Sequence, residues 1–234
     1  MLLRKTKIPM KMTYLLLTLL VTLGISSCQS DPEPVDKKKK VDLQGHRGAR
    51  AYRPENTLPA FQYCMDKKMD TIELDTVVTK DKQLIVYHDT NLNGKLCLDQ
   101  SGNPAQSIPI KDLTVEELKT YDCGTLKNEK FEKQMPMPGT RLSTLPEVFA
   151  FVKQYETHHN IKEKFRYNIE LKLSEEYANT DVEEVAELIV NTIEDAGVAE
   201  RSIVQCFVTE LLPLVKKRNP AIRTSALYTL TRFQ

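Results

Sequence analysis

Three acidic side chains occupy strand-like segments, where a charged group is costly to bury. Glu73 and Asp75 lie in an apolar run at residues 71–79, and Glu170 lies in another at residues 167–173. Residues i and i+2 of a strand face the same side, so Glu73 and Asp75 point together. Converging carboxylates repel one another unless a hard cation lies among them, and oxygen ligands suit Ca²⁺ or Mg²⁺. The sequence therefore predicts a divalent cation site formed by these three residues.

Two histidines and two cationic side chains accompany similar segments. His46 and Arg47 follow residues 41–44, His88 follows residues 84–87, and Lys172 stands two residues after Glu170. An imidazole with an ordinary pKa near ~6.5 can accept a proton while a second one donates a proton at neutral pH. A guanidinium and an ammonium beside a metal suit an anionic ester such as a phosphodiester. The residue types thus predict acid–base chemistry on such an ester and leave open which histidine is the acid.

The segments that carry these residues alternate with amphipathic helices, which predicts a parallel α/β sheet, either open or closed into a barrel. Active sites of such barrels collect at the carboxyl ends of the strands. Residues 90–140 are rich in Gly and Pro and are expected to form an insertion with one short helix. We expect Asn56 or Thr57 to cap one helix, and Thr180 or Asp181 another. The expected strands are residues 41–44, 71–79, 84–87, 167–173, 202–207 and 222–228.

Five ordered motifs together resemble the glycerophosphodiester phosphodiesterase family over about residues 41–228. They are His46-Arg47-Gly48, Pro54-Glu55-Asn56-Thr57 with Ala60-Phe61, Ile72-Glu73-Leu74-Asp75, His88-Asp89 and Asn168-Ile169-Glu170-Leu171-Lys172. Five matches in order are far more specific than any one tripeptide. The resemblance implies a (β/α)8 TIM barrel that hydrolyses glycerophosphodiesters to an alcohol and glycerol 3-phosphate.

The resemblance also implies a role for each matching residue. Glu73, Asp75 and Glu170 would be the ligands of Ca²⁺ or Mg²⁺. His46 and His88 would be the acid–base pair, Arg47 and Lys172 the phosphate contacts, and Glu55 a supporting residue that orients the metal or the substrate. The glycerol 2-hydroxyl would attack phosphorus first, and water would then open the cyclic phosphate.

The chain also departs from the family pattern. Leu92-Asn93-Gly94-Lys95-Leu96-Cys97 stands where the family often has Arg-Thr-Thr, so the leaving-group alcohol stays open. About six of the eight barrel strands are expected, and there is no tryptophan, which the family usually carries on its last strand. Two alternatives follow: a truncated, non-catalytic surface lipoprotein, or a phospholipase-C-like diesterase acting on another head group.

The first 40 residues carry export and anchoring signals. A basic start and a 12-residue apolar run at residues 14–25 predict a signal peptide over residues 1–27, because the run is too short to span a bilayer. Ile25-Ser26-Ser27-Cys28 resembles the bacterial lipobox, which predicts a lipidated Cys28. Residues 28–40 are charged and contain proline, as expected of a tether. The predicted location is the bacterial cell envelope, with the protein lipid-anchored and either periplasmic or surface-exposed.

Charge and cysteine content add two further expectations. The whole chain has a formal net charge of +1, and removal of residues 1–27 leaves 29 basic and 32 acidic side chains, so nucleic acid is not an expected partner. Residues 41–234 form one expected domain, whose oligomeric state the sequence leaves open.

Cys97 and Cys123 are the pair expected to form a disulfide if one exists, whereas Cys64 and Cys206 are expected to be buried thiols.

Overall fold

A computed structural model of the chain describes residues 41–162, 164–173 and 182–229. The predicted signal peptide at residues 1–27, the lipidated Cys28, the tether at residues 28–40 and the helix caps Thr180 and Asp181 lie outside the described residues. Those features remain predictions. Within the described ranges, no helix is both long enough and apolar enough to cross a membrane.

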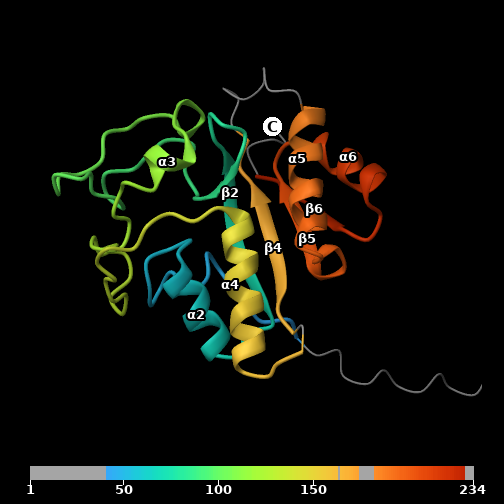
Figure 1. Cartoon of the computed structure of the whole chain (residues 1–234), viewed down its shortest axis with the longest axis horizontal. Helices are drawn as coiled ribbons and strands as arrows, with labels where there is room; N and C mark the ends of the chain where they lie inside the picture. The colour runs from blue at the N-terminus through green and yellow to red at the C-terminus, as the bar shows by residue number, and fades with distance from the viewer. Residues whose placement is uncertain (1–40, 163, 174–181, 230–234) are drawn as a thin grey trace, which may run out of the picture. The chain divides into compact units, whose positions relative to one another are not determined.

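One sheet organises the domain. Its main path runs β1–β2–β4–β5–β6, and every neighbouring pair on this path is parallel (Figure 1). Helices connect these strands, so the predicted α/β class is confirmed. The parallel strands are β1 (Gln44–Gly45), β2 (Thr71–Val78), β4 (Arg166–Leu171), β5 (Ser202–Cys206) and β6 (Arg223–Ala226).

One predicted barrel strand is not parallel. β3 (Leu84–Val86) pairs antiparallel with β2 and lies off the main path of the sheet. Residues 79–83 alone connect the two strands, whereas a parallel crossover needs about a dozen residues or more. The six expected strands are all present among the described residues, and five of them run parallel. A complete (β/α)8 barrel has eight parallel strands.

Among the described residues, four helices of eight or more residues cover the sheet. Figure 1 shows α2 (Leu58–Asp66) beside α4 (Leu145–His158), and α5 (Val182–Asp195) beside α6 (Leu211–Arg218). The α2 cap is Thr57, whose side chain accepts a hydrogen bond from the backbone N–H of Ala60. A capping box made by Thr144 and Glu147 begins α4. Each helix turns its apolar stripe into the common core.

The two faces of β4 have different tasks. Tyr167, Ile169 and Leu171 are buried in the apolar core. Glu170 lies between them in the sequence and faces the other side, because side chains alternate along a strand. The face of β4 that the helices cover therefore packs in the core, and the opposite face carries Glu170 of the candidate site.

Residues 90–140, where the sequence predicts an insertion, are drawn in green in Figure 1. They hold a 3-10 helix at Ile110–Asp112 and the short α3 (Val115–Leu118), and a second 3-10 helix at Ala199–Arg201 precedes β5. A disulfide joins Cys97 and Cys123, which confirms the expected pair. Cys64 and Cys206 are buried free thiols, as predicted.

Candidate active site

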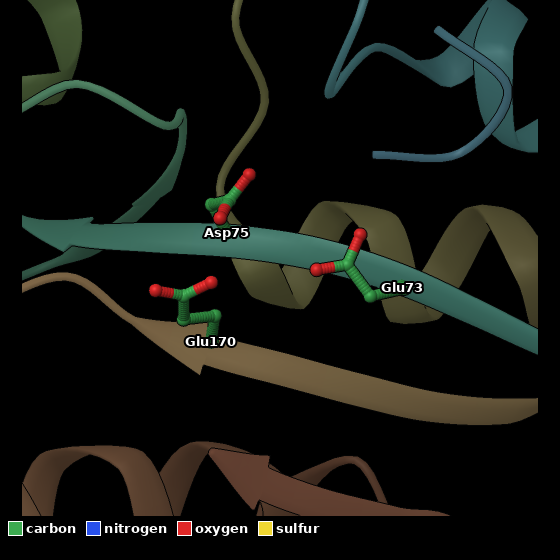
Figure 2. Close-up of side chains that lie close together, drawn as sticks. All are labelled: Glu73, Asp75 and Glu170. Carbon is green, nitrogen blue, oxygen red and sulfur yellow. The ribbon is translucent and has the colours of Figure 1, made fainter. Parts of the chain in front are cut away.

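Glu73, Asp75 and Glu170 lie together on two neighbouring strands. β2 and β4 pair with Asp75 directly opposite Glu170, and Glu73 lies two residues earlier on β2. One oxygen from each residue lies within 4.8 Å of the others, and all three residues are buried. Figure 2 shows the three carboxylate groups close together. The strand pattern and the sheet register thus bring the three predicted acids to one place.

Burial makes this cluster expensive when it is charged. Burial and then the charge of Asp75 raise the pKa of Glu73 to about 7. Burial also raises the pKa of Glu170, although Lys172 opposes the shift. The Oδ1 atom of Asp75 is buried and has no hydrogen bond of acceptable geometry within the described residues. Three hard oxygen donors, one of them without a hydrogen bond, fit a Ca²⁺ or Mg²⁺ ion.

Two cationic side chains flank the acids. The Nζ atom of Lys172 lies 2.5 Å from Oε1 of Glu170 and 3.2 Å from Oδ1 of Asp75. The Nε atom of Arg47 lies 3.4 Å from Oδ2 of Asp75, and its Nη1 atom donates to Oε1 of Glu55 at 2.6 Å. Glu55 therefore contacts Arg47 directly, and the two cations stand where an anion at the cluster would meet them.

The chain turns sharply after β1 so that Arg47 can reach this place. Arg47 has a φ of 49°, and Gly48 follows with a φ of 78°. A Cβ on Gly48 would lie 2.9 Å from Ala60, so glycine lets the turn pack against α2. The backbone N–H of Arg47 donates to Oε2 of Glu73 at 2.6 Å, and that of Gly48 donates to the carbonyl of Glu73 at 2.9 Å.

The two predicted histidines have different surroundings. The His46 side chain is about half exposed, and its Nε2 lies 4.0 Å from Oε2 of Glu73. Partial burial and the charges of Arg50 and Arg47 lower the pKa of His46 to about 4. The Nδ1 atom of His88 lies 2.6 Å from Oδ1 of Asp89. A neutral His88 that donates from Nδ1 keeps its Nε2 free to exchange a proton.

Two further residues hold the acids in place and were missed by the sequence reasoning. Asn56 was considered only as a helix cap, but its Nδ2 donates to Oδ2 of Asp75 at 2.8 Å and its Oδ1 accepts the N–H of Asp75 at 3.2 Å. Gln205 on β5 donates to Oε1 of Glu73 at 3.4 Å. Gln205 faces the site because it pairs in register with Glu170. Period-two alternation along β5 could have revealed it.

The strands are parallel and alternate with helices. Acidic, imidazole and cationic side chains lie near the carboxyl ends of these strands. This combination defines an α/β protein of the (β/α)8-barrel class. Residues 46–232 match the model of the glycerophosphoryl diester phosphodiesterase family. The chain belongs to this family, as its five motifs suggested.

Named relatives and solved structures agree with this membership. A glycerophosphodiester phosphodiesterase of Caldanaerobacter subterraneus subsp. tengcongensis is 34% identical over 189 residues, which cover 81% of this chain and 67% of the relative. One from Bacillus subtilis is 29% identical and is covered to 72%. The chain thus spans about two thirds to three quarters of the length of these relatives.

The solved structures show the same fold. A Silicibacter pomeroyi structure that carries the family name has a TM-score of 0.75 at 23% identity, with 83% of this chain and 67% of that one covered. An Oleispira antarctica phosphodiesterase has a TM-score of 0.61 at 21% identity, with 80% and 65% covered, and it is in complex with the product sn-glycerol-3-phosphate.

Proposed function

We propose that this chain hydrolyses glycerophosphodiesters to an alcohol and glycerol 3-phosphate with a bound divalent cation. The observation that carries the proposal is the cluster of Glu73, Asp75 and Glu170 in one register of β2 and β4. Family membership supports the activity, and the product bound to the Oleispira antarctica relative supports a small phosphodiester as substrate. Hydrolysis of small glycerophosphodiesters is therefore the function that the site fits best.

Each residue of the candidate site has a separate role in the proposed reaction. Glu73, Asp75 and Glu170 would hold Ca²⁺ or Mg²⁺, which stabilises negative charge that develops on the phosphoryl oxygens. Arg47 and Lys172 bind the anionic oxygens of the substrate as charge-assisted donors. Glu55 and Asn56 orient Arg47 and Asp75 through the hydrogen bonds given above.

His46 and His88 transfer the protons. One imidazole takes the proton of the glycerol 2-hydroxyl as its oxygen bonds to phosphorus, and the other protonates the leaving alcohol as its bond to phosphorus breaks. Water then opens the cyclic phosphate with the two roles reversed, which yields glycerol 3-phosphate. Both imidazoles lie within reach of solvent, since neither side chain is fully buried.

Release of glycerol 3-phosphate tests the proposal. The chain is incubated with glycerophosphocholine, glycerophosphoethanolamine or glycerophosphoinositol and either Mg²⁺ or Ca²⁺, and the product is measured by a coupled dehydrogenase. We expect turnover that a chelator removes and Glu73→Gln abolishes. Glu129→Gln, which neutralises an exposed acid of the insertion, is the matched control and should retain activity. Absence of product with both cations would reject the proposal and favour the non-catalytic lipoprotein, and cleavage of sphingomyelin instead would favour the phospholipase-C-like alternative.

We also propose that the protein is held at the bacterial cell envelope by a lipidated Cys28. The support is the apolar run followed by Ile25-Ser26-Ser27-Cys28 in the sequence. Expression in a bacterial host with a labelled fatty acid should give a labelled protein in the membrane fraction. Cys28→Ser should lose the label, and a label that persists in this variant would contradict the anchor.

A further inference from the structure

Asp89 connects the candidate catalytic His88 to a loop residue that neither the motifs nor the proposed mechanism includes. Oδ1 of Asp89 lies 2.6 Å from Nδ1 of His88, and Oδ2 of Asp89 accepts a hydrogen bond from Nδ2 of Asn93 at 2.8 Å. The two oxygens of one carboxylate are thus used by two different partners. His88, Asp89 and Asn93 also line the same surface hollow, so the imidazole stays accessible to a small molecule.

Asn93 is itself fixed at each of its polar atoms. Its backbone N–H donates to the hydroxyl of Tyr87 at 3.0 Å, and its Oδ1 accepts the N–H of Lys95 at 2.9 Å. Its carbonyl accepts the N–H groups of Leu96 and Cys97 at 2.9 and 3.0 Å. A side chain held at both its amide nitrogen and its amide oxygen has one orientation available, so it can hold a neighbour in place.

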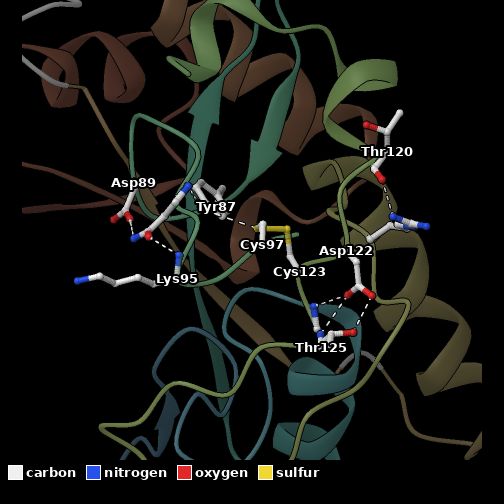
Figure 3. The surroundings of a disulfide bond; sticks show 11 residues. Tyr87, Asp89, Lys95, Cys97, Thr120, Asp122, Cys123 and Thr125 are labelled. Atoms are coloured by element: carbon white, nitrogen blue, oxygen red, sulfur yellow. Dashed lines mark hydrogen bonds between the residues drawn. A yellow bond between two sulfur atoms is a disulfide. The ribbon is translucent and has the colours of Figure 1, made fainter. Parts of the chain in front are cut away.

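The disulfide secures the loop that carries Asn93. Cys97 is fully buried and bonded to Cys123, and its Sγ lies 3.9 Å from the hydroxyl of the buried Tyr87 (Figure 3). Tyr87 directly precedes His88 in the sequence. The hydroxyl of Tyr87 therefore ties the loop to the segment from which the catalytic side chain projects.

The hydrogen bond that Asp89 accepts from His88 determines the tautomer and the orientation of the imidazole ring. A carboxylate that accepts from Nδ1–H fixes the tautomer and the ring plane and leaves the lone pair on Nε2, as an orienting carboxylate does in other acid–base sites. The His88 hydrogen bond, and then that from Asn93, lower the pKa of Asp89 despite its partial burial. Asp89 is therefore charged at neutral pH and keeps its acceptor role.

We propose that Asn93 is a positioning residue, which acts through Asp89 to fix the ring orientation and the tautomer of His88. The effect on catalysis rests on the proposed function, whereas the effect on His88 does not. Asn93 lies in Leu92-Asn93-Gly94-Lys95-Leu96-Cys97, where the chain departs from the common family pattern, so this chain uses its own insertion to support the histidine.

The substitution Asn93→Asp separates positioning from loop structure. It keeps the Oδ1 acceptor for the N–H of Lys95 and all backbone bonds, but it removes the donor to Asp89 and places a second negative charge beside it. Asn128→Asp is the matched control, because Oδ1 of Asn128 accepts the N–H of Lys130 at 3.1 Å in the same kind of turn. We expect kcat to fall at least about 10-fold in Asn93→Asp, with KM changed by less than about twofold, and neither to change in Asn128→Asp.

Nitrogen-15 spectra of the histidine rings give a readout that needs no turnover. The chain has four histidines, so the His88 signals can be assigned with His88→Gln. In Asn93→Asp the Nδ1 and Nε2 shifts of His88 should move, while those of His158 and His159 should not. If Asn93→Asp does not fold, Asn93→Ser provides the same test, since serine can keep the turn but is too short to reach Asp89.

The outcomes separate this inference from the proposed function. Moved His88 signals together with a lower kcat support the positioning role. Unmoved His88 signals overturn it, whether or not the wild-type chain is active, and moved signals with an unchanged kcat overturn its catalytic part. If the wild-type chain releases no product but the His88 signals still move, the structural inference stands and the proposed function fails.

Discussion

Two regions of the molecule position candidate catalytic groups in opposite ways. Glu73, Asp75 and Glu170 project from paired strands, so the register of β2 and β4 determines their separation. His88 lies two residues after β3, where Asp89 and Asn93 orient it through side-chain hydrogen bonds. Backbone hydrogen bonds between paired strands thus position the three acids, whereas side-chain hydrogen bonds and one disulfide position His88.

The two regions should respond differently to amino-acid substitutions. A strand in the sheet interior holds its side chains through many cooperative backbone bonds, so a single substitution on it changes chemistry more than geometry. A loop depends on a few specific contacts, so the loss of one contact changes geometry first. Substitutions in the first region should therefore remove activity and preserve the fold. Those in the second should alter local order and stability.

The largest effect is expected for the acids on the strands. Asp75→Asn should lower kcat/KM by about 1,000-fold or more, because a metal that loses a charged ligand supplies several kcal/mol less stabilisation to the transition state. The metal-free variant should melt close to the wild type, since relief of the repulsion within the acidic cluster offsets the lost ion pairs with Arg47 and Lys172. Activity assays and calorimetry with chelator check both. A variant that unfolds would show that Asp75 is needed for structure as well as for metal binding.

The next effect is expected for the histidine on the loop. His88→Gln should lower kcat by about 100-fold or more through the loss of a general acid or base. His158→Gln removes an exposed histidine on α4 and should leave kcat unchanged. Steady-state kinetics at saturating cation distinguish the two. Equal loss in both variants would mean that His88 has no specific role in the reaction.

The site residues on the strands could be predicted from the sequence because side chains alternate regularly along a strand. Alternation placed Glu73, Asp75 and Glu170 on one face, and motif order placed His46, Arg47, His88 and Lys172 at strand ends. The details that the sequence left undecided depended on contacts between distant segments. The five-residue link after β2 made β3 antiparallel, and Thr57 took the cap position while Asn56, with a φ of 56°, turned to Asp75. Such choices follow from tertiary structure, which local propensity does not encode.

The disulfide provides a stability test of the loop region. Cys97→Ser with Cys123→Ser opens a link that spans 26 residues, which should lower the free energy of unfolding by about 3 kcal/mol. Urea unfolding measures the loss, and reduced wild-type protein should match the double variant. Hydrogen exchange should increase in residues 90–140 and change little in β2 and β4. Equal increases in both regions would contradict the division between strand-held and loop-held groups.

The smallest effect concerns Asp122, which binds the same loop together next to the disulfide (Figure 3). Its carboxylate accepts hydrogen bonds from the N–H groups of Gly124, Thr125 and Gly139 and from the hydroxyl of Thr125. Burial alone would raise the pKa of Asp122, but these bonds outweigh it and hold the pKa below its usual 3.8. A carboxyl whose folded pKa is lowered stabilises the protein above its unfolded pKa, and this stabilisation is lost as the pH falls through the folded pKa.

Asp122→Asn should therefore destabilise the protein by about 1–2 kcal/mol at pH 7, because the amide group cannot accept the bonds made to Oδ2. The difference from wild type should shrink below about pH 4, where the wild-type carboxylate becomes protonated. Asp99→Asn is the control, since the bonds from Ser101 and Asn103 reach a single oxygen that asparagine retains. Urea unfolding at pH 7 and pH 3 gives the comparison. A difference that stays constant with pH would mean that the charge of Asp122 contributes nothing, and that the shape of its side chain alone holds the loop beside the strands.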